Sequence, residues 1–163
     1  MAASQTILRV VSLDGLPALG ELIASYLRVQ FQHMAVEHDD RLRGLGGGPA
    51  PCGFVLVQRL PLSDVRKLAD AILRVRSAFP QAPVLVAAAS ANSGAAAAAL
   101  SCGAQGFVAP LLPLSTLRDA VRIVLAGGSW FPQPASEAYE GPCRRKAQAN
   151  DWSGPERRRL QKP

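Results

Sequence analysis

The stretch PVLVAAASANSGAAAAALSCGAQGFVAP, residues 83–110, decides the fold. Its first apolar run, 83–87, has no polar alternation, which is typical of a strand buried on both faces of a sheet. The alanine-rich run 95–100 has a very high helix propensity, and Gly103 is a favourable residue to end that helix. A second apolar run at 107–109 completes a strand–helix–strand unit, which predicts two parallel strands.

The alternation of strand and helix continues on both sides of this stretch. Further strands are predicted at residues 7–11, 31–36 and 54–57, and further helices begin near Pro17, Ser63 and Ser115. The apolar positions expected to face the core from the first helix are Leu19, Leu22, Ile23, Tyr26 and Leu27. Five strands alternating with five helices predict an α/β protein with a flavodoxin-like, doubly wound parallel sheet, (βα)5.

The connection before the third strand, GLGGGPAPCG at residues 44–53, is rich in glycine and allows only a short second helix. A glycine-rich loop that holds phosphate follows a strand and opens a helix, so that backbone amides and the helix dipole meet the anion. This segment precedes a strand and contains two prolines. We therefore interpret it as a flexible connection.

Four segments carry a family resemblance: PCGFVLVQRLP at 51–61, PVLVAAAS at 83–90, ALSCGAQGFVAP at 99–110 and LRDAVRIVLAGGSWFP at 117–132. In this order they resemble the third strand through the fifth helix of NarL/LuxR-type response-regulator receiver domains. The resemblance covers roughly residues 6–132. It implies a CheY-like fold and a non-enzymatic role in two-component signal transduction or transcription regulation.

The resemblance also implies a phosphorylation site, and this sequence lacks nearly all of it. Of the acidic pair after the first strand only Asp14 is present. The phosphoacceptor position falls on Val57, the Thr/Ser position on Ala88 and the Lys position on Pro110. Phe107 matches the aromatic residue that rotates on phosphorylation in the family, or it simply fills the edge of the core.

The chemistry of this loss follows from the residues themselves. An acyl phosphate needs a carboxylate nucleophile, and the accompanying divalent metal needs several oxygen ligands. Val57 supplies neither, and the amide of Gln58 is no nucleophile and faces the other side of the strand. Pro110 removes a cation and a backbone donor. The sequence therefore predicts a pseudo-receiver without cofactor or metal.

In receivers the partner surface is the face of the fourth helix, fifth strand and fifth helix. Here the fourth helix carries the alanine run 95–99 and lacks the charges that mark a solvated side. A protein partner or a second copy of the chain is expected to dock on this face. The alternative is that the alanines reflect GC-rich coding, as does an excess of Arg over Lys.

The positive charge is concentrated at the end of the chain. The formal net charge is +6; residues 141–163 hold 7 Lys/Arg against 2 Asp/Glu, whereas residues 1–140 hold 11 against 10. We interpret 133–163 as a basic, disordered linker or tail, in which WSGPERRRL at 152–160 is similar to the opening of a LuxR-type helix-turn-helix. Candidate nucleic-acid contacts are Arg144, Arg145, Lys146, Trp152, Arg157, Arg158 and Arg159. Either the tail attaches to DNA, without base readout, or it is merely solvated.

The remaining residues argue against other classes. Cys52, Cys102 and Cys143 are widely spaced and are interpreted as reduced thiols. The cluster at 38–40 is expected to be a solvated turn, and neither histidine adjoins a nucleophile in sequence, so a hydrolase has little support. The chain lacks an apolar run long enough to span a bilayer, which predicts a soluble, cytoplasmic protein.

Overall fold

The computed structural model describes residues 6–13, 17–40, 42, 50–58, 65–88, 93–109 and 113–131 of the chain. The strands are β1 (Ile7–Ser12), β2 (Ala35–Asp39), β3 (Gly53–Gln58), β4 (Val84–Ala88) and β5 (Gly106–Val108). The helices are α1 (Pro17–Gln30), α2 (Val65–Ala78), α3 (Ser93–Ser101) and α4 (Leu114–Leu125).

The five strands form one parallel sheet in the order β2-β1-β3-β4-β5. Because the chain moves from β1 outward to β2 and then returns to β3 on the other side, the order reverses between β1 and β3. This confirms the predicted doubly wound, flavodoxin-like sheet. In such a sheet, functional groups gather at the carboxyl ends of the strands, beside the reversal.

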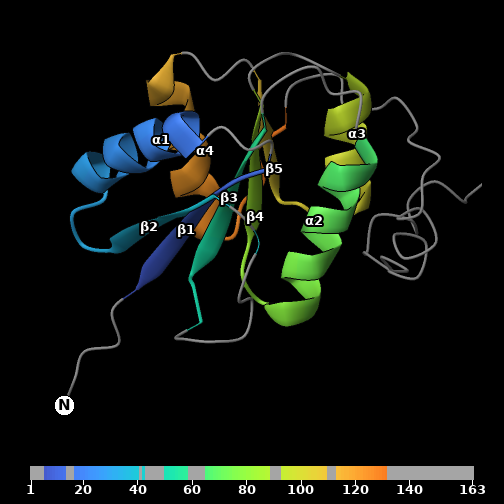
Figure 1. Ribbon diagram of the computed structural model, residues 1–163, viewed down its shortest axis with the longest axis horizontal. Coiled ribbons are helices and arrows are strands. Elements are labelled where there is room, and N and C mark those ends of the chain that lie inside the picture. The colour runs from blue at the N-terminus through green and yellow to red at the C-terminus, as the bar shows by residue number, and fades with distance from the viewer. Residues whose placement is uncertain are drawn as a thin grey trace, which may run out of the picture.

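Helices cover both faces of the sheet, with α1 and α4 on one side and α2 and α3 on the other (Figure 1). All six residues of β3 are buried. Val55 and Val57 belong to the core under α1 and α4, whereas Phe54 and Leu56 belong to the core under α2 and α3. A strand covered on both faces needs apolar residues at every position, which explains the continuous apolar runs.

The helices owe their packing to single apolar faces. In α4, Leu117, Val121 and Val124 are buried while Arg122 is exposed, as the sequence spacing predicts. After α3, Gly103 has a φ of +86°, a left-handed conformation that side chains with a Cβ rarely adopt. The prediction that Gly103 ends the alanine-rich helix is therefore confirmed.

The second strand was predicted four residues too early. Phe31 packs into the core, but residues 32–34 form a turn, and the strand begins at Ala35 and continues through polar residues to Asp39. β2 is an edge strand with partly exposed residues, so its true extent carries no continuous apolar signal. Leu22 was also placed wrongly, since it is 57% exposed while Gly20 and Ala24 are buried in its place.

Two further expectations concern the connections. A short second helix was expected before the third strand, but between residues 41 and 49 only Leu42 lies within the described residues. Cys52 is a free thiol, whereas Cys102 is disulfide-bonded. The expectation of reduced thiols is therefore wrong for Cys102, because the spacing of cysteines in a sequence does not determine which of them come close enough to pair.

Candidate functional site at the carboxyl edge of the sheet

The parallel register brings the strand ends together at one edge of the sheet. Ser12 of β1 pairs with Val57 of β3, and Gln58 of β3 pairs with Ala88 of β4. Asp14 and Pro110, which the resemblance places at this edge, lie outside the described residues. So do all the candidate nucleic-acid contacts between residues 144 and 159.

Val57, the residue that the resemblance places at the phosphoacceptor position, is a buried aliphatic side chain. Val57 is 3% exposed and packs in the core under α1 and α4. Ala88 and Phe107 are also buried, but in the core under α2 and α3. A valine surrounded by apolar side chains offers no oxygen to a metal ion or to a phosphoryl group.

Gln58 is the polar group left at the end of the central strand. Its residue is 2% exposed, and its buried Oε1 has no hydrogen-bond partner among the residues that the structure describes. Since side chains alternate along β3, Gln58 faces the opposite side from Val57, toward the α2 and α3 layer. Burying an amide oxygen without a donor lowers the free energy of unfolding by about 1 to 3 kcal/mol.

On the α1 side, three polar side chains form a chain that the sequence reasoning missed. Ser12 Oγ lies 3.0 Å from His38 Nε2, and His38 Nδ1 lies 3.3 Å from Glu21 Oε2. The three residues come from β1, β2 and α1, and the parallel register of β1 with β2 places them together. Only the strand pairing could have revealed this arrangement, because their sequence separation carries no signal.

The arrangement has the order of a nucleophile, a base and an orienting carboxylate, but it is closed to substrates. Ser12 is 3% exposed. Its hydroxyl lies under Gly20 of α1, where even an added Cβ would collide with Ser12 Oγ and His38. Acyl transfer needs a reachable hydroxyl and an oxyanion site beside it. The Ser12–His38–Glu21 chain therefore joins α1 to the ends of β1 and β2 as a structural element.

Glu21 also binds Arg28 along the same helix, at 2.6 Å. This hydrogen bond from Arg28 is the main cause that lowers the pKa of the Glu21 carboxyl below its ordinary value of 4.5. Both side chains are about half exposed, so solvent screens the pair. The carboxylate that orients His38 is thus held in its charged form.

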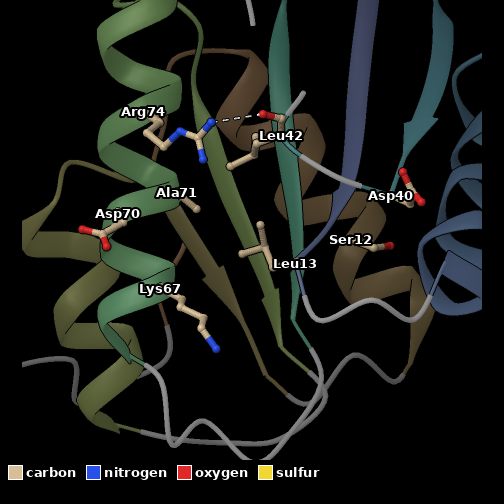
Figure 2. A pocket seen from close by; sticks show the side chains of 8 residues that line it. All are labelled: Ser12, Leu13, Asp40, Leu42, Lys67, Asp70, Ala71 and Arg74. Carbon is tan, nitrogen blue, oxygen red and sulfur yellow. Dashed lines mark hydrogen bonds between the residues drawn. The ribbon is translucent and has the colours of Figure 1, made fainter. Parts of the chain in front are cut away.

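A pocket of about 310 Å³ lies beside this edge, on the α2 side (Figure 2). It is lined by Ser12, Leu13, Asp40, Leu42, Lys67, Asp70, Ala71 and Arg74. In the described residues, no group of three or more His, Cys, Asp or Glu side chains could hold a metal ion. No described helix is long and apolar enough to cross a membrane.

The expected partner face runs over α3, β5 and α4, because α3 is the helix that the resemblance counts as the fourth. The alanines at 95–99 are all buried, so they offer little surface to another molecule. The exposed large apolar side chains on these two helices are instead Leu100, at 48%, and Ile123, at 38%.

Solved structures with the same fold are response-regulator receiver proteins. A LuxR family DNA-binding response regulator from Silicibacter pomeroyi shares 20% identity at a TM-score of 0.59, over 80% of this chain and 98% of that one. The isolated REC domain of RcsB from Salmonella enterica serovar Typhimurium shares 17% at 0.59, over 83% and 99%. A response regulator from Thermotoga maritima shares 15% at 0.57, over 75% and 98%.

These likenesses confirm the CheY-like receiver fold. No protein-family model and no curated protein matches the sequence.

Proposed function

We propose that this chain is a non-phosphorylatable pseudo-receiver that acts in the cytoplasm, without enzymatic activity, in signal transduction or transcription regulation. The observation that carries the proposal is Val57, a buried aliphatic residue at the carboxyl end of the central strand of a receiver fold. Ala88 supports it, since a buried alanine at the expected Thr/Ser position has no hydroxyl that could bind a phosphoryl group.

Phosphorylation can be tested directly. The full chain is incubated with acetyl phosphate and magnesium and its intact mass is measured, with a conventional receiver as positive control. We expect no phosphoryl adduct, because the carboxylate nucleophile is absent at position 57. An adduct that disappears in the Asp14→Ala variant would overturn the proposal.

The output is proposed to be contact with a protein partner or a second copy through α3, β5 and α4. Leu100 and Ile123 supply exposed apolar surface there. Sedimentation velocity of Leu100→Glu tests the homodimer, with Leu22→Glu on α1 as matched control because Leu22 is similarly exposed. Loss of association in the Leu100 variant alone supports this face, and equal loss in both variants contradicts it.

A second candidate function is attachment to nucleic acid through the tail, favoured by the 7 Lys/Arg at residues 141–163. Phosphate contacts of this kind are salt-sensitive and independent of base sequence. Gel shifts at two salt concentrations would compare the full chain with a variant carrying Arg157→Gln, Arg158→Gln and Arg159→Gln. Equal affinity in the two proteins would exclude a role for these arginines.

A further inference from the structure

We propose that the disulfide of Cys102 ties the C-terminal tail to the end of α3 through Cys143, and that thiol–disulfide exchange opens and closes this link. In the closed form, residues 132–143 cover the outward side of α3. In the reduced form, that side is free to contact another molecule. As a control of the proposed partner face, the inference rests on the proposed function; as a disulfide between two named cysteines it stands alone.

The pairing follows from the cysteines of the chain. The sequence has three, Cys52, Cys102 and Cys143. Cys102 is disulfide-bonded, and Cys52 is a free thiol. For a disulfide within the chain, Cys143, which lies outside the described residues, is therefore the partner that remains.

The Cys102 end of this link is held rigidly. Its backbone N–H donates to the carbonyl of Ala98 at 2.9 Å, directly after α3. In the same turn, Arg76 Nη1 from α2 donates to the carbonyl of Gly103 at 3.0 Å. The Cys102 side chain is 5% exposed and belongs to the core under α2 and α3. Because Cys102 is already held in place, forming the bond costs it little conformational entropy.

The described part of the chain ends on the same side of the sheet. Trp130 lies along β5, where its carbonyl accepts from Phe107 N–H at 2.7 Å. The next residue, Phe131, packs against the same core cluster as Cys102. From residue 131 to Cys143 is a step of 12 residues. A chain of this length spans up to about 40 Å, whereas a helix of nine residues such as α3 is only about 14 Å long. Cys143 therefore lies within reach of Cys102.

The burial of α3 shows that its outward side is covered. Successive residues of an α-helix are about 100° apart around the axis, so five in a row point to all sides. The alanines at 95–99 are each at most 3% exposed. Yet α3 lies in an outer layer of the fold, packed on α2 and β5, where a helix normally keeps one side in solvent (Figure 1). We assign this cover to residues 132–143, which the disulfide would hold there.

The exchange balances with a small disulfide such as oxidised glutathione. As the bond forms, the thiols of Cys102 and Cys143 each give up one proton and one electron. The disulfide of the small molecule takes up both electrons and both protons and becomes two thiols. Opening is the reverse reaction. Disulfides in the cytosol are usually transient or redox-sensing, which fits an input other than phosphorylation.

Peptide mapping tests the pairing. The full chain is equilibrated with oxidised glutathione, alkylated with iodoacetamide without reduction and digested with trypsin. Cleavage after Lys and Arg places Cys102 in peptide 77–118 and Cys143 in peptide 123–144. We expect these two peptides to be joined and Cys52 to be alkylated. Alkylation of all three cysteines, or a link from 77–118 to the Cys52 peptide or to a second copy of itself, would overturn the proposal.

Matched variants test the effect on α3. In the original chain and in Cys52→Ser, reduction should shift the amide signals of Ala97 and Leu100 and lower the melting temperature by about 5 to 10 °C. Signals on α1, such as that of Val29, should stay in place. Cys143→Ser should give the reduced spectrum in oxidising and reducing buffer alike. If the α3 signals of the original chain do not change on reduction, the disulfide does not control this surface and the switch is refuted.

Failure of this inference is distinguishable from failure of the proposed function. A phosphoryl adduct from acetyl phosphate would refute the pseudo-receiver and leave the peptide map unchanged. Conversely, three alkylated cysteines after oxidation would refute the disulfide and leave the absence of phosphorylation intact.

Discussion

Ser12 and Gln58 are the two buried polar side chains in the described part of the chain, and they differ in one respect. Both stand at the carboxyl ends of adjacent strands. Ser12 faces α1 and has a hydrogen-bond partner in His38, whereas Gln58 faces the other layer and its Oε1 has no partner within the described segments. Buried polar groups in folded proteins are nearly always paired, so the unpaired one is the exception that calls for an explanation.

The comparison separates a closed side of the molecule from an incomplete one. Under α1, the Ser12–His38–Glu21 chain satisfies its own donors and acceptors and leaves no room for a ligand. Under α2 and α3, the amide oxygen of Gln58 has no partner in the described part of the chain, and a pocket lies between α2 and the end of β1.

The largest expected effect comes from filling the space above Ser12. A Cβ at Gly20 would collide with Ser12 Oγ and His38 Nε2, so Gly20→Ala must displace either these two side chains or α1. We expect a loss of about 1 to 3 kcal/mol in the free energy of unfolding, despite the better helix propensity of alanine.

Urea unfolding measures this loss. Gly94→Ala, at an exposed glycine of α3, is the control and should be neutral or slightly stabilising. If Gly20→Ala is as stable as the control, α1 is not packed closely on the strand ends.

Substitutions at the two buried polar residues should change the free energy of unfolding in different directions. Ser12→Ala leaves His38 Nε2 without its partner and should cost about 1 to 2 kcal/mol of unfolding free energy. Gln58→Met keeps a similar shape and removes an unpaired oxygen, so it should be neutral or stabilising by up to about 1 kcal/mol.

Thermal or urea unfolding of both variants and of the original chain measures these two changes in the free energy of unfolding. A cost for Gln58→Met equal to that for Ser12→Ala would show that the amide makes an essential bond, and the contrast between the two sides would disappear.

The fold and the site differ in how far the sequence predicts them. The sheet was predictable because buried parallel strands need continuous apolar runs, as in 54–57, and because glycines such as Gly103 mark helix ends. β2 was misplaced because an edge strand need not be apolar. The Ser12–His38–Glu21 chain was missed because three elements supply it, and only the strand register shows that they meet.

The pocket was equally beyond prediction, for a different reason. Lys67 and Arg74 look in the sequence like ordinary charges on the outer side of α2. Both residues line the pocket together with Asp40 and Asp70, and which side chains border a pocket depends on packing rather than on periodicity. The proposal that the chain is not phosphorylated rests on the sequence, because the residue expected at the phosphoacceptor position, Val57, has no carboxylate nucleophile.

The smallest expected effect on stability concerns the exposed ion pair between Glu21 and Arg28 on α1. Arg28 lowers the pKa of Glu21 in the folded chain relative to its ordinary value of 4.5, so the folded state favours the charged carboxylate. The resulting stabilisation is present above about pH 4.5 and is lost as the pH falls through the lowered folded-state pKa. Unfolding midpoints of the original chain and Glu21→Gln should therefore differ at pH 6.5 and converge in acid, and Arg28→Gln should show the same convergence. A difference that persists or grows in acid would mean that Glu21 acts through packing on α1 rather than through its charge, and the polar chain would then end at His38.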